Sequence, residues 1–581
     1  MCEQRTEKVR LQNDSLIQNF CVSLQILKND CRSNWFLPLA VDVIVRKMKK
    51  ILYFLILVLF ASCESFDVQQ LRQHPTYLVE IEDADWVVRF DEVSDDQLTG
   101  RAYKADRLVS EAHPFTAKIG RKSCTLNMPG VAERVTIRIR KEGERVKCRA
   151  GAPLSKHFSI KPLDIPDYKA FTAQYESPLY KVKVKKDVVY AKAEGYWSQY
   201  PDADESFAKI YARKIPNLLM GMQPLDLKMD IYEPDDGGSS RRPMMVFVHG
   251  GAFFNGDKQG APIVKWCRHY ASLGYVVVSP NYRMGFVPYR EAIDKAGYRA
   301  VQDVHAAVRY MLHRASTYRI NPDWVFVGGS SAGAITALNV AFMRDKDRPQ
   351  TVLDEGKIAK LATDCPEKVK VRAVANLWGA VHDTLILQNS PSTAIISFHG
   401  DADAIVPYGH DYPFRSILNP AGGVIGHDDG GKSPGANKGN SLHDQMISKM
   451  FGSYCIDRYA HRHGMRSRLF TKKGGGHSLH VDEHRNIVPY FYTIRDSVAR
   501  FFYGEMVPVP LRLRHSADRP LEFRYDNANI AEIYWKVTGG VLLEESPKAV
   551  WVLFFSDESK RSLTFSGKYK NGVEFSKTVK Y

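Results

Sequence analysis

The sequence predicts an α/β protein with a doubly wound, mostly parallel sheet, flanked along the chain by two β-rich domains. Two observations support this fold class. In the middle of the chain, apolar and β-branched runs alternate with amphipathic helical segments, which is typical of parallel strands covered on both faces. Before and after this region, short alternating strands follow one another with turn residues between them. We therefore expect one central α/β domain and two accessory β domains.

The composition is that of a folded globular protein. Of the 581 residues, 44% are hydrophobic and 25% are charged, which excludes a mainly disordered, collagen-like or coiled-coil chain. The net charge of +16 raises the question of nucleic-acid binding. The basic clusters, however, alternate with apolar residues or precede a hydrophobic run, and they match no nucleic-acid-binding motif. We expect no nucleic-acid partner.

A hydrophobic segment near the N-terminus predicts export. Residues 51–60 form an unbroken run of ten apolar residues directly after Met48-Lys49-Lys50. Such a run spans only about 15 Å as a helix, half of a bilayer core, and is therefore typical of a signal peptide rather than of a transmembrane helix. The Ala61-Ser62-Cys63 that follows resembles a bacterial lipobox, which implies cleavage before Cys63 and diacylglycerol on its sulfur.

These features predict where the mature protein begins. We expect 1–47 to be an over-extended reading of the start codon and 48–62 to be a lipoprotein signal peptide. The mature chain would then be lipid-anchored to a membrane of the bacterial cell envelope, facing the periplasm or the cell surface. Five of the nine cysteines come after Cys63. Among them, Cys124 and Cys148 flank a strand-like stretch, which is compatible with a local disulfide in an oxidising compartment.

The first accessory domain is predicted at 67–180 and the second at 506–581. In the first, strands are expected at 77–81, 86–90 and 134–139. In the second, strands are expected at 521–525, 533–537, 550–555 and 562–565, separated by Gly-Gly, Ser-Pro and Asn-Gly turns that suit a small β-sandwich. The first domain contains no recognisable catalytic constellation.

The central domain is predicted at 196–505. Its strands are expected at 225–231, 244–248, 275–279, 324–327, 373–377 and 394–398. A helix is expected at 297–315, where apolar residues recur at helical spacing. The segment 419–440, rich in Gly, Asp and Pro, predicts a long loop.

The clearest chemical signal is a tight turn between the strand at 324–327 and the helix that follows. Here Gly329-Ser330-Ser331-Ala332-Gly333 matches G-x-S-x-G with Ser331 at its centre. Such a turn needs glycine on both sides because a Cβ atom would clash, and it presents the central hydroxyl at the edge of the sheet. Ser330 lacks the glycine two residues further on. The sequence therefore predicts Ser331 as a nucleophile.

A serine nucleophile needs a base and an acid. A neutral imidazole takes the hydroxyl proton, and a carboxylate fixes and stabilises that imidazole. Doubly wound hydrolases place these groups in the chain order serine, acid, histidine. Asp403 follows the strand at 394–398. His477 lies in a Gly-rich turn that follows a strand-like stretch. We expect these two residues to complete the triad.

Other candidates for these roles are weaker. Asp401 comes two residues before Asp403, where we expect it to shape the turn rather than to act as the acid. His480 and His484 lie beyond the Gly-rich turn, towards the last helix of the domain.

Taken together, several motifs resemble those of the α/β-hydrolases, in the group of carboxylesterases and feruloyl or acetyl xylan esterase-like enzymes. They are His249-Gly250-Gly251-Ala252-Phe253, Gly256-Asp257, Ser279-Pro280-Asn281-Tyr282-Arg283, Asp303, Gly329 to Gly333, His399-Gly400 with Asp403, and Gly476-His477-Ser478. The resemblance covers about 225 to 505. It implies a serine hydrolase that works through an acyl-enzyme without a metal or other cofactor.

The resemblance also implies an oxyanion hole and supporting residues. The backbone N–H groups of Gly251, Ala252 and Ala332 would bind the oxyanion. Asp257 and Asp303 would be structural, because one stands in a turn and the other on a helix.

The substrate is open at this stage. Small-molecule, lipid and polysaccharide esters all remain compatible, with Phe253, Phe254 and Trp378 as candidate pocket residues and 341–370 or the loop at 419–440 as a candidate cap. Two other functions are also compatible with the sequence. One is a serine peptidase of the prolyl-oligopeptidase type, although the N-terminal β region is too short for its propeller. The other is a non-catalytic envelope binding protein on a hydrolase scaffold.

Overall fold

The structure is a computed structural model. It describes residues 75–81, 85–94, 97–120, 123–128, 132–142, 145–149, 158–200, 207–238, 241–365, 368–414, 447–507, 509–526 and 528–581. The expected N-terminal extension, signal peptide and Cys63 lie outside these residues, and so does the loop expected at 419–440. Within the described ranges, no helix combines the length and the apolar character needed to cross a bilayer.

Two compact units can be distinguished by their internal contacts. One takes its described residues from Met1–Ala170, Leu511–Gly567 and Ser576–Tyr581. The other consists of Phe171–Pro510 and Lys568–Phe575.

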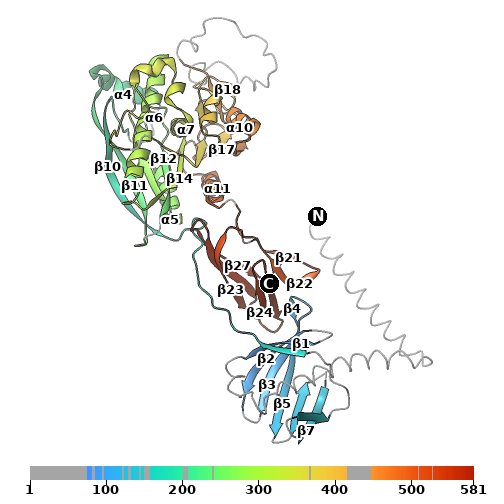
Figure 1. The fold of residues 1–581 in the computed structure, drawn as a ribbon. Coiled ribbons are helices and arrows are strands. Elements are labelled where there is room, and N and C mark those ends of the chain that lie inside the picture. The colour runs from blue at the N-terminus through green and yellow to red at the C-terminus, as the bar shows by residue number, and fades with distance from the viewer. Residues whose placement is uncertain are drawn as a thin grey trace, which may run out of the picture. The chain divides into compact units, whose positions relative to one another are not determined.

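The second unit is built around an eight-stranded sheet (Figure 1). In sheet order its strands are β10 (Lys181–Gly195), β11 (Gln223–Asp235), β13 (Val276–Pro280), β12 (Arg242–Val248), β14 (Ile320–Ser330), β15 (Ala373–Leu377), β17 (Ala394–Gly400) and β20 (Ser467–Lys472). All neighbours from β13 to β20 are parallel, and β10 and β11 are antiparallel. This confirms the predicted mostly parallel sheet. Strands β12, β13, β15 and β17 are buried along their whole length, as their continuous apolar sequences require.

The sheet contains a point at which the order of the strands reverses. The chain passes from β12 outward to β13 and then returns past β12 to β14. Because crossovers between parallel strands are right-handed, the two connecting helices lie on opposite faces of the sheet. In such sheets, ligands bind where the carboxyl ends of the strands meet at the reversal. This location is the end of β12 and β14.

Helices connect and cover the strands. They are α4 (Phe207–Met220), α5 (Ala261–Leu273), α6 (Arg290–His313), α7 (Ala332–Phe342), α10 (Ser453–Arg462) and α11 (Pro489–Met506), with short 3-10 turns η1 (Asp345–Asp347), η2 (Gln350–Glu355) and η3 (Thr384–Asn389). Helices α5 and α11 pack together through Trp266 and Phe491, whose rings stack at 4.7 Å. A small sheet of β16 (Ala380–Val381), β19 (Met450–Gly452) and β18 (His410–Asp411) lies beyond the end of β15 in the chain.

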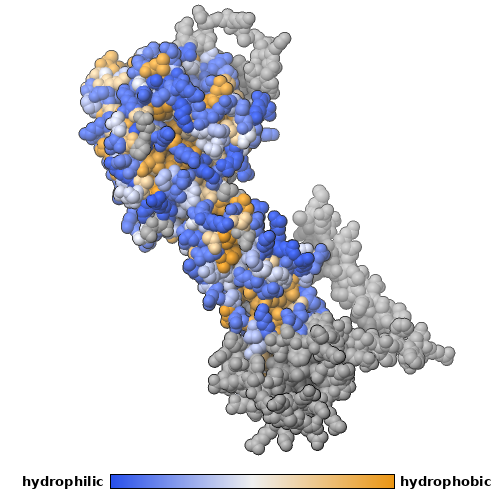
Figure 2. Space-filling view, viewed as in Figure 1, coloured by the Kyte–Doolittle hydropathy of each residue, from blue (hydrophilic) through white to orange (hydrophobic). Residues whose placement is uncertain are grey.

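Helix α4 is only partly covered. Its Ile210 is 1% exposed and belongs to the core, whereas Leu219 and Met220 near its end are 83% and 68% exposed. Figure 2 shows an apolar surface area at the position of this helix.

Strand β10 extends the sheet before residue 196, where the sequence places the start of the α/β domain. It pairs antiparallel with β11 from Lys181 to Gly195. Lysines alternate with small and apolar residues along this strand, so it lacks the continuous apolar run of a central strand. Lysine is common on edge strands because its charge hinders pairing with a further chain.

The first unit contains β-sheets from both ends of the chain. One sheet has the order β8 (Arg145–Arg149), β7 (Ala132–Glu142), β6 (Ser123–Met128), β5 (His113–Gly120), β3 (Gln97–Lys104), β2 (Trp86–Val93), β1 (Thr76–Ile81) and β9 (Phe158–Pro162). The others are β21 (Arg514–Ser516), β22 (Arg519–Arg524), β25 (Ala549–Phe555) and β24 (Gly540–Ser546), and β23 (Ile530–Thr538), β26 (Ser562–Tyr569) and β27 (Glu574–Lys580).

The N-terminal and C-terminal β regions share contacts that the sequence does not reveal. Strand β4 (Val109–Ser110) pairs in parallel with the end of β25. The rings of Tyr103 and Phe555 stack at 4.2 Å within one apolar cluster. These contacts join segments more than 400 residues apart in the sequence.

The backbone of the first sheet also bears on the expected disulfide. Cys124 lies on β6 and Cys148 on β8, with β7 between them. Since neighbouring strands are about 4.8 Å apart, the two Cα atoms are at least about 10 Å apart, beyond the roughly 7 Å limit for a disulfide. The local disulfide that the sequence suggested is therefore excluded.

Candidate active site

The predicted nucleophile lies in a strained turn between β14 and α7. Ser331 has φ 57° and ψ −124°, an unusual conformation for a residue with a side chain. The Ser331 N–H donates to the carbonyl of Leu377, 2.9 Å away, which holds the turn against β15.

The two glycines of the motif allow this turn to approach the end of β12. A Cβ atom on Gly329 would lie 2.5 Å from the backbone carbon of Gly333. A Cβ atom on Gly333 would overlap the carbonyl oxygens of Val248 and His249. Neither position tolerates a side chain unless the backbone moves, which is the physical reason for the G-x-S-x-G pattern.

The three residues predicted as a triad come together. His477 Nε2 lies 2.9 Å from Ser331 Oγ, and His477 Nδ1 lies 2.7 Å from Asp403 Oδ2. They follow the carboxyl ends of β14, β17 and β20, so parallel strands bring them to one edge of the sheet. Because Nδ1 faces a carboxylate, it carries the proton, and Nε2 is left as the acceptor for the serine hydroxyl.

Asp403 contacts four polar groups of the protein. Its Oδ1 accepts from the backbone N–H groups of Ile405 and Val406 at 2.8 and 3.0 Å. Its Oδ2 contacts His477 and also His399, whose Nε2 is 3.2 Å away. Burial raises the pKa of the Asp403 carboxyl, but the hydrogen bonds to the two histidines outweigh burial and hold this pKa below its ordinary value. The side chain is therefore charged near neutral pH.

His399 was not singled out as a partner of Asp403 from the sequence. It is fully buried at the end of β17, and its Nδ1 lies 2.7 Å from Ser453 Oγ. In the sequence, His399 can be recognised by its position at the end of the strand, four residues before Asp403.

The predicted base packs against a buried aromatic group. The Trp378 ring meets His477 edge to face at 6.3 Å and stacks on His480 at 4.9 Å. Burial, together with the neighbouring His477, lowers the pKa of His480 to about 3, so its ring is neutral. His480 also stacks on Trp266 at 5.1 Å. It is therefore a core residue rather than a competing base.

The loop after β12 is shaped for close backbone approach. Gly251, Ala252 and Phe253 have successive positive φ angles of 109°, 54° and 59°. A Cβ atom on Gly251 would overlap the carbonyl oxygen of Asn255. The ring of His249 stacks on that of Tyr282 at 4.4 Å, and the Tyr282 hydroxyl donates to the His249 carbonyl at 3.0 Å. His249 thus supports the loop.

Only two of the three predicted oxyanion donors belong to residues that line the pocket at Ser331. Ala252 and Ala332 line the same pocket as Ser331, whereas Gly251 is not among its lining residues. Ala332 is the first residue of α7, so its N–H has no acceptor within the helix. The positive end of the helix dipole also lies at this point.

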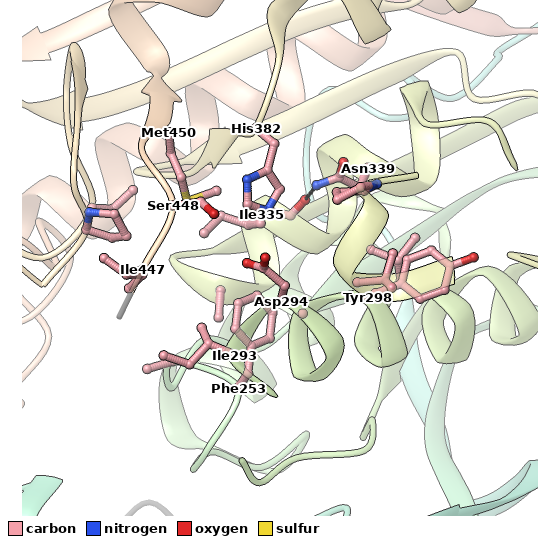
Figure 3. Close-up of a pocket in the computed structure, with 18 of the residues that line it drawn as sticks. Phe253, Ile293, Asp294, Tyr298, Ile335, Asn339, His382, Ile447, Ser448 and Met450 are labelled. Atoms are coloured by element: carbon pink, nitrogen blue, oxygen red, sulfur yellow. Dashed lines mark hydrogen bonds between the residues drawn. The ribbon is translucent and has the colours of Figure 1, made fainter. Parts of the chain in front are cut away.

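The pocket beside Ser331 extends between α6 and α7 (Figure 3). Phe253 lines it, as expected. The other two candidate aromatic residues do not: Phe254 is fully buried in the core, and Trp378 is 1% exposed behind His477. Met343, Pro349 and Val352 also line the pocket, so part of the segment 341–370, a candidate cap, contributes to its wall.

Asp303 and Asp257 have structural roles, as expected. The Arg283 backbone N–H and Nε donate to Asp303 at 2.6 and 2.9 Å, and both side chains are almost fully buried. Asp257 accepts from the backbone N–H of Gln259 at 2.7 Å within its turn.

Comparisons with known proteins give matches to parts of this chain. Residues 229–393 match the family model BD-FAE. Carboxylesterase 3B of Mus musculus is 30% identical over 115 residues, which is 19% of this chain and 19% of that protein. Bile salt-activated lipase of Mus musculus is 33% identical over 103 residues, 16% of this chain and 17% of the lipase. The chain thus spans less than a fifth of the length of these relatives.

Among solved structures, esterase 2 of Thermogutta terrifontis is similar in two states. Its apo form has a TM-score of 0.32 with 17% identity, covering 48% of this chain and 90% of the esterase. The form phosphoramylated by tabun has a TM-score of 0.33 with 17% identity, covering 48% and 89%. By the family-model match, residues 229–393 of the present chain are similar to the BD-FAE family.

Proposed function

We propose that this protein is a serine hydrolase that cleaves carboxylic esters through an acyl-enzyme intermediate. The observation that carries this proposal is the position of His477, which contacts both Ser331 Oγ and Asp403 Oδ2. The BD-FAE match and the carboxylesterase-like relatives support an ester as the substrate.

In the first half of the reaction, Ser331 Oγ attacks the ester carbonyl carbon. His477 Nε2 takes the hydroxyl proton, and Asp403 stabilises the imidazolium that forms. The carbonyl oxygen gains negative charge, and the backbone N–H groups of Ala252 and Ala332 are the donors proposed to bind it. When the tetrahedral intermediate collapses, His477 gives its proton to the leaving alcohol, and the acyl group stays on Ser331.

In the second half, water replaces the alcohol. His477 Nε2 takes a proton from this water as its oxygen attacks the acyl carbon. The Ser331 Oγ then leaves, receives the proton from His477 and returns to its starting state, while the carboxylic acid is released. Small-molecule and polysaccharide esters are both proposed as substrates.

The experiment that tests this proposal is labelling with a fluorophosphonate, which reacts with activated serines. We expect the purified protein to be labelled on Ser331, as located by mass spectrometry of the adduct, and Ser331→Ala to remain unlabelled. Ser330→Ala is the matched control, because it removes the neighbouring hydroxyl and should label like the wild type. A folded wild-type protein that is not labelled, or a label on another residue, would contradict the proposed nucleophile.

We also propose that the mature chain begins at Cys63 and is lipid-anchored in a bacterial envelope. The support is the sequence pattern of 48–62 and the small residues before Cys63. Mass spectrometry of the N-terminal peptide from bacterial membranes should find diacylglycerol on Cys63. In a Cys63→Ala variant the protein should lose this modification and leave the membrane fraction. An unmodified N-terminus upstream of 48 would refute the proposal.

A further inference from the structure

The pocket beside Ser331 is lined by one face of each of two helices. From α7 it receives Ile335 and Asn339, which are four residues apart and so lie on one face. From α6 it receives Asp294 and Tyr298 among others. The helical rise of 1.5 Å per residue puts Asn339 about 12 Å along α7 from Ser331. The pocket is therefore deep enough to hold a substantial part of a substrate.

Three polar side chains in this pocket have no role in the mechanism described above. Asp294, Asn339 and His382 line it together with apolar groups such as Ile335 and Phe253 (Figure 3). Asp294 is 9% exposed and Asn339 is 3% exposed. Polar groups that are this strongly buried normally have hydrogen-bond partners, so their surroundings indicate what they are there to bind.

Asp294 has one oxygen occupied by the protein. Its Oδ2 accepts from Thr351 Oγ1 at 2.9 Å. In the part of the chain that the structure describes, this is the one hydrogen bond found for the Asp294 side chain. The Oδ1 atom is thus an acceptor for a group inside the pocket.

His382 faces Asp294 across the pocket. Figure 3 shows the ring of His382 and the carboxylate of Asp294 on opposite sides of the same space. Among the described residues, no hydrogen bond or ion pair within 4 Å joins them. Burial lowers the pKa of His382, and the charge of Arg290 adds to this, while Asp294 acts in the opposite direction. The imidazole is therefore neutral near pH 7, with one nitrogen that donates and one that accepts.

Asn339 adds a further acceptor. Its Nδ2 donates to the carbonyl of Ile335 at 2.9 Å, which fixes the orientation of the amide. Its Oδ1 is buried and has no hydrogen-bond partner among the described residues. A buried acceptor without a donor is unfavourable, and a ligand donor in the pocket would satisfy it.

We propose that this pocket selects esters whose pocket-bound part carries a hydroxyl group, which donates to Asp294 and accepts from His382. This inference rests on the proposed ester hydrolysis at Ser331. A hydroxyl fits the gap because it can donate to Asp294 and accept from the N–H of His382, whereas a carboxylate would be repelled by Asp294. The apolar side chains around these groups contact the carbon skeleton. Asp294 and His382 are thus specificity-determining residues.

The test measures binding of intact esters to the Ser331→Ala protein, in which turnover does not interfere. Two pairs differ only by a terminal hydroxyl: ethyl 6-hydroxyhexanoate against ethyl hexanoate, and 6-hydroxyhexyl acetate against hexyl acetate. The first pair places the hydroxyl in the acyl part and the second in the alcohol part. By titration calorimetry we expect the hydroxylated member of one pair to bind about tenfold tighter or more, the effect of a hydrogen bond to a charged group.

Further variants in the Ser331→Ala background test whether Asp294 and His382 cause this preference. Asp294→Leu and His382→Phe should each bring the ratio of the two affinities close to one. Glu291→Leu makes the same kind of change three residues earlier on α6, where the side chain is 51% exposed, and should leave the ratio unchanged. Circular dichroism verifies that each variant is folded.

Several outcomes would overturn the inference. They are equal binding of both members in both pairs, a preference that survives Asp294→Leu and His382→Phe, or tighter binding of ethyl 6-aminohexanoate than of the hydroxyl ester. Failure of the proposed function gives a different result, because the wild-type protein would then not react with the fluorophosphonate. The binding comparison is independent of that reaction.

Discussion

His399 Nε2 lies 3.2 Å from Asp403 Oδ2, the same carboxylate oxygen that contacts His477. The acid of the proposed triad is thus shared between two imidazoles. Ser453 Oγ, 2.7 Å from Nδ1 of His399, orients the second ring. We infer that His399 is a positioning residue, which holds the carboxylate where it can bond to the base.

Replacing His399 by phenylalanine, which cannot donate to Asp403, should lower kcat without removing the triad itself. The loss of a hydrogen bond to a charged group corresponds to a decrease of about 10- to 100-fold, with KM for a short p-nitrophenyl ester nearly unchanged. Steady-state kinetics of the purified variant would measure both constants. His484→Phe, at a histidine that is 76% exposed, is the control and should behave like the wild type. A normal kcat for His399→Phe would mean that Asp403 needs no support from this ring.

Replacing Asp403 by asparagine should have a larger effect. The amide presents a donor to His477 Nδ1 and so favours the tautomer with the proton on Nε2, which cannot accept from Ser331. In serine hydrolases this change lowers kcat by about 10⁴-fold. The rate of fluorophosphonate labelling should fall together with ester turnover. If labelling persisted at the wild-type rate, another carboxylate would be the acid.

The buried His480 should make the fold sensitive to acid. The histidine pKa is 6.5 in the unfolded chain and about 3 in the folded protein, so as the pH falls below 6.5 the unfolded state binds the proton first. The contribution of neutral His480 to the free energy of unfolding is therefore fully present above pH 6.5. It decreases towards pH 3 by up to about 1.4 kcal/mol per pH unit.

This prediction can be checked with His480→Phe, which keeps a ring between Trp266 and Trp378. Urea unfolding at several pH values from 7 to 4 would give the free energy of unfolding of both proteins. The wild type should lose stability more steeply than the variant. Parallel curves would show that His480 takes up no proton on unfolding in this range.

Two glycine-to-alanine changes should act in opposite directions. In Gly333→Ala the new methyl group overlaps the carbonyl oxygens at the end of β12, which should lower the free energy of unfolding by about 1–3 kcal/mol and disturb Ser331. In Gly504→Ala, within α11, the added Cβ meets no atom of the described residues within 4 Å, apart from its chain neighbours and the backbone of its own helix. This change should stabilise the protein by about 0.5–1 kcal/mol. Chemical denaturation would measure both, and a neutral Gly333→Ala would refute the close-packed turn.

The candidate site was largely predictable because its groups follow strand ends. Ser331, Asp403 and His477 each come directly after a recognisable apolar strand, and parallel strands bring their carboxyl ends to one edge. The pocket was less predictable. Aromatic residues near a motif are often core residues, which is the case for Phe254 and Trp378. Asp294 and His382 belong to no motif and line the same pocket only because α6 lies beside the segment after β16.

By itself, the sequence determined the local structure: the buried strands, the glycine turn at Ser331 and the order of the triad residues. These features follow from hydrophobic periodicity and from backbone sterics, which act over a few residues. The tertiary structure decided the relations between distant segments. The shared oxygen of Asp403, the pocket between α6 and α7, and the stacking of Tyr103 on Phe555 depend on packing between elements far apart in the chain, which no local pattern records.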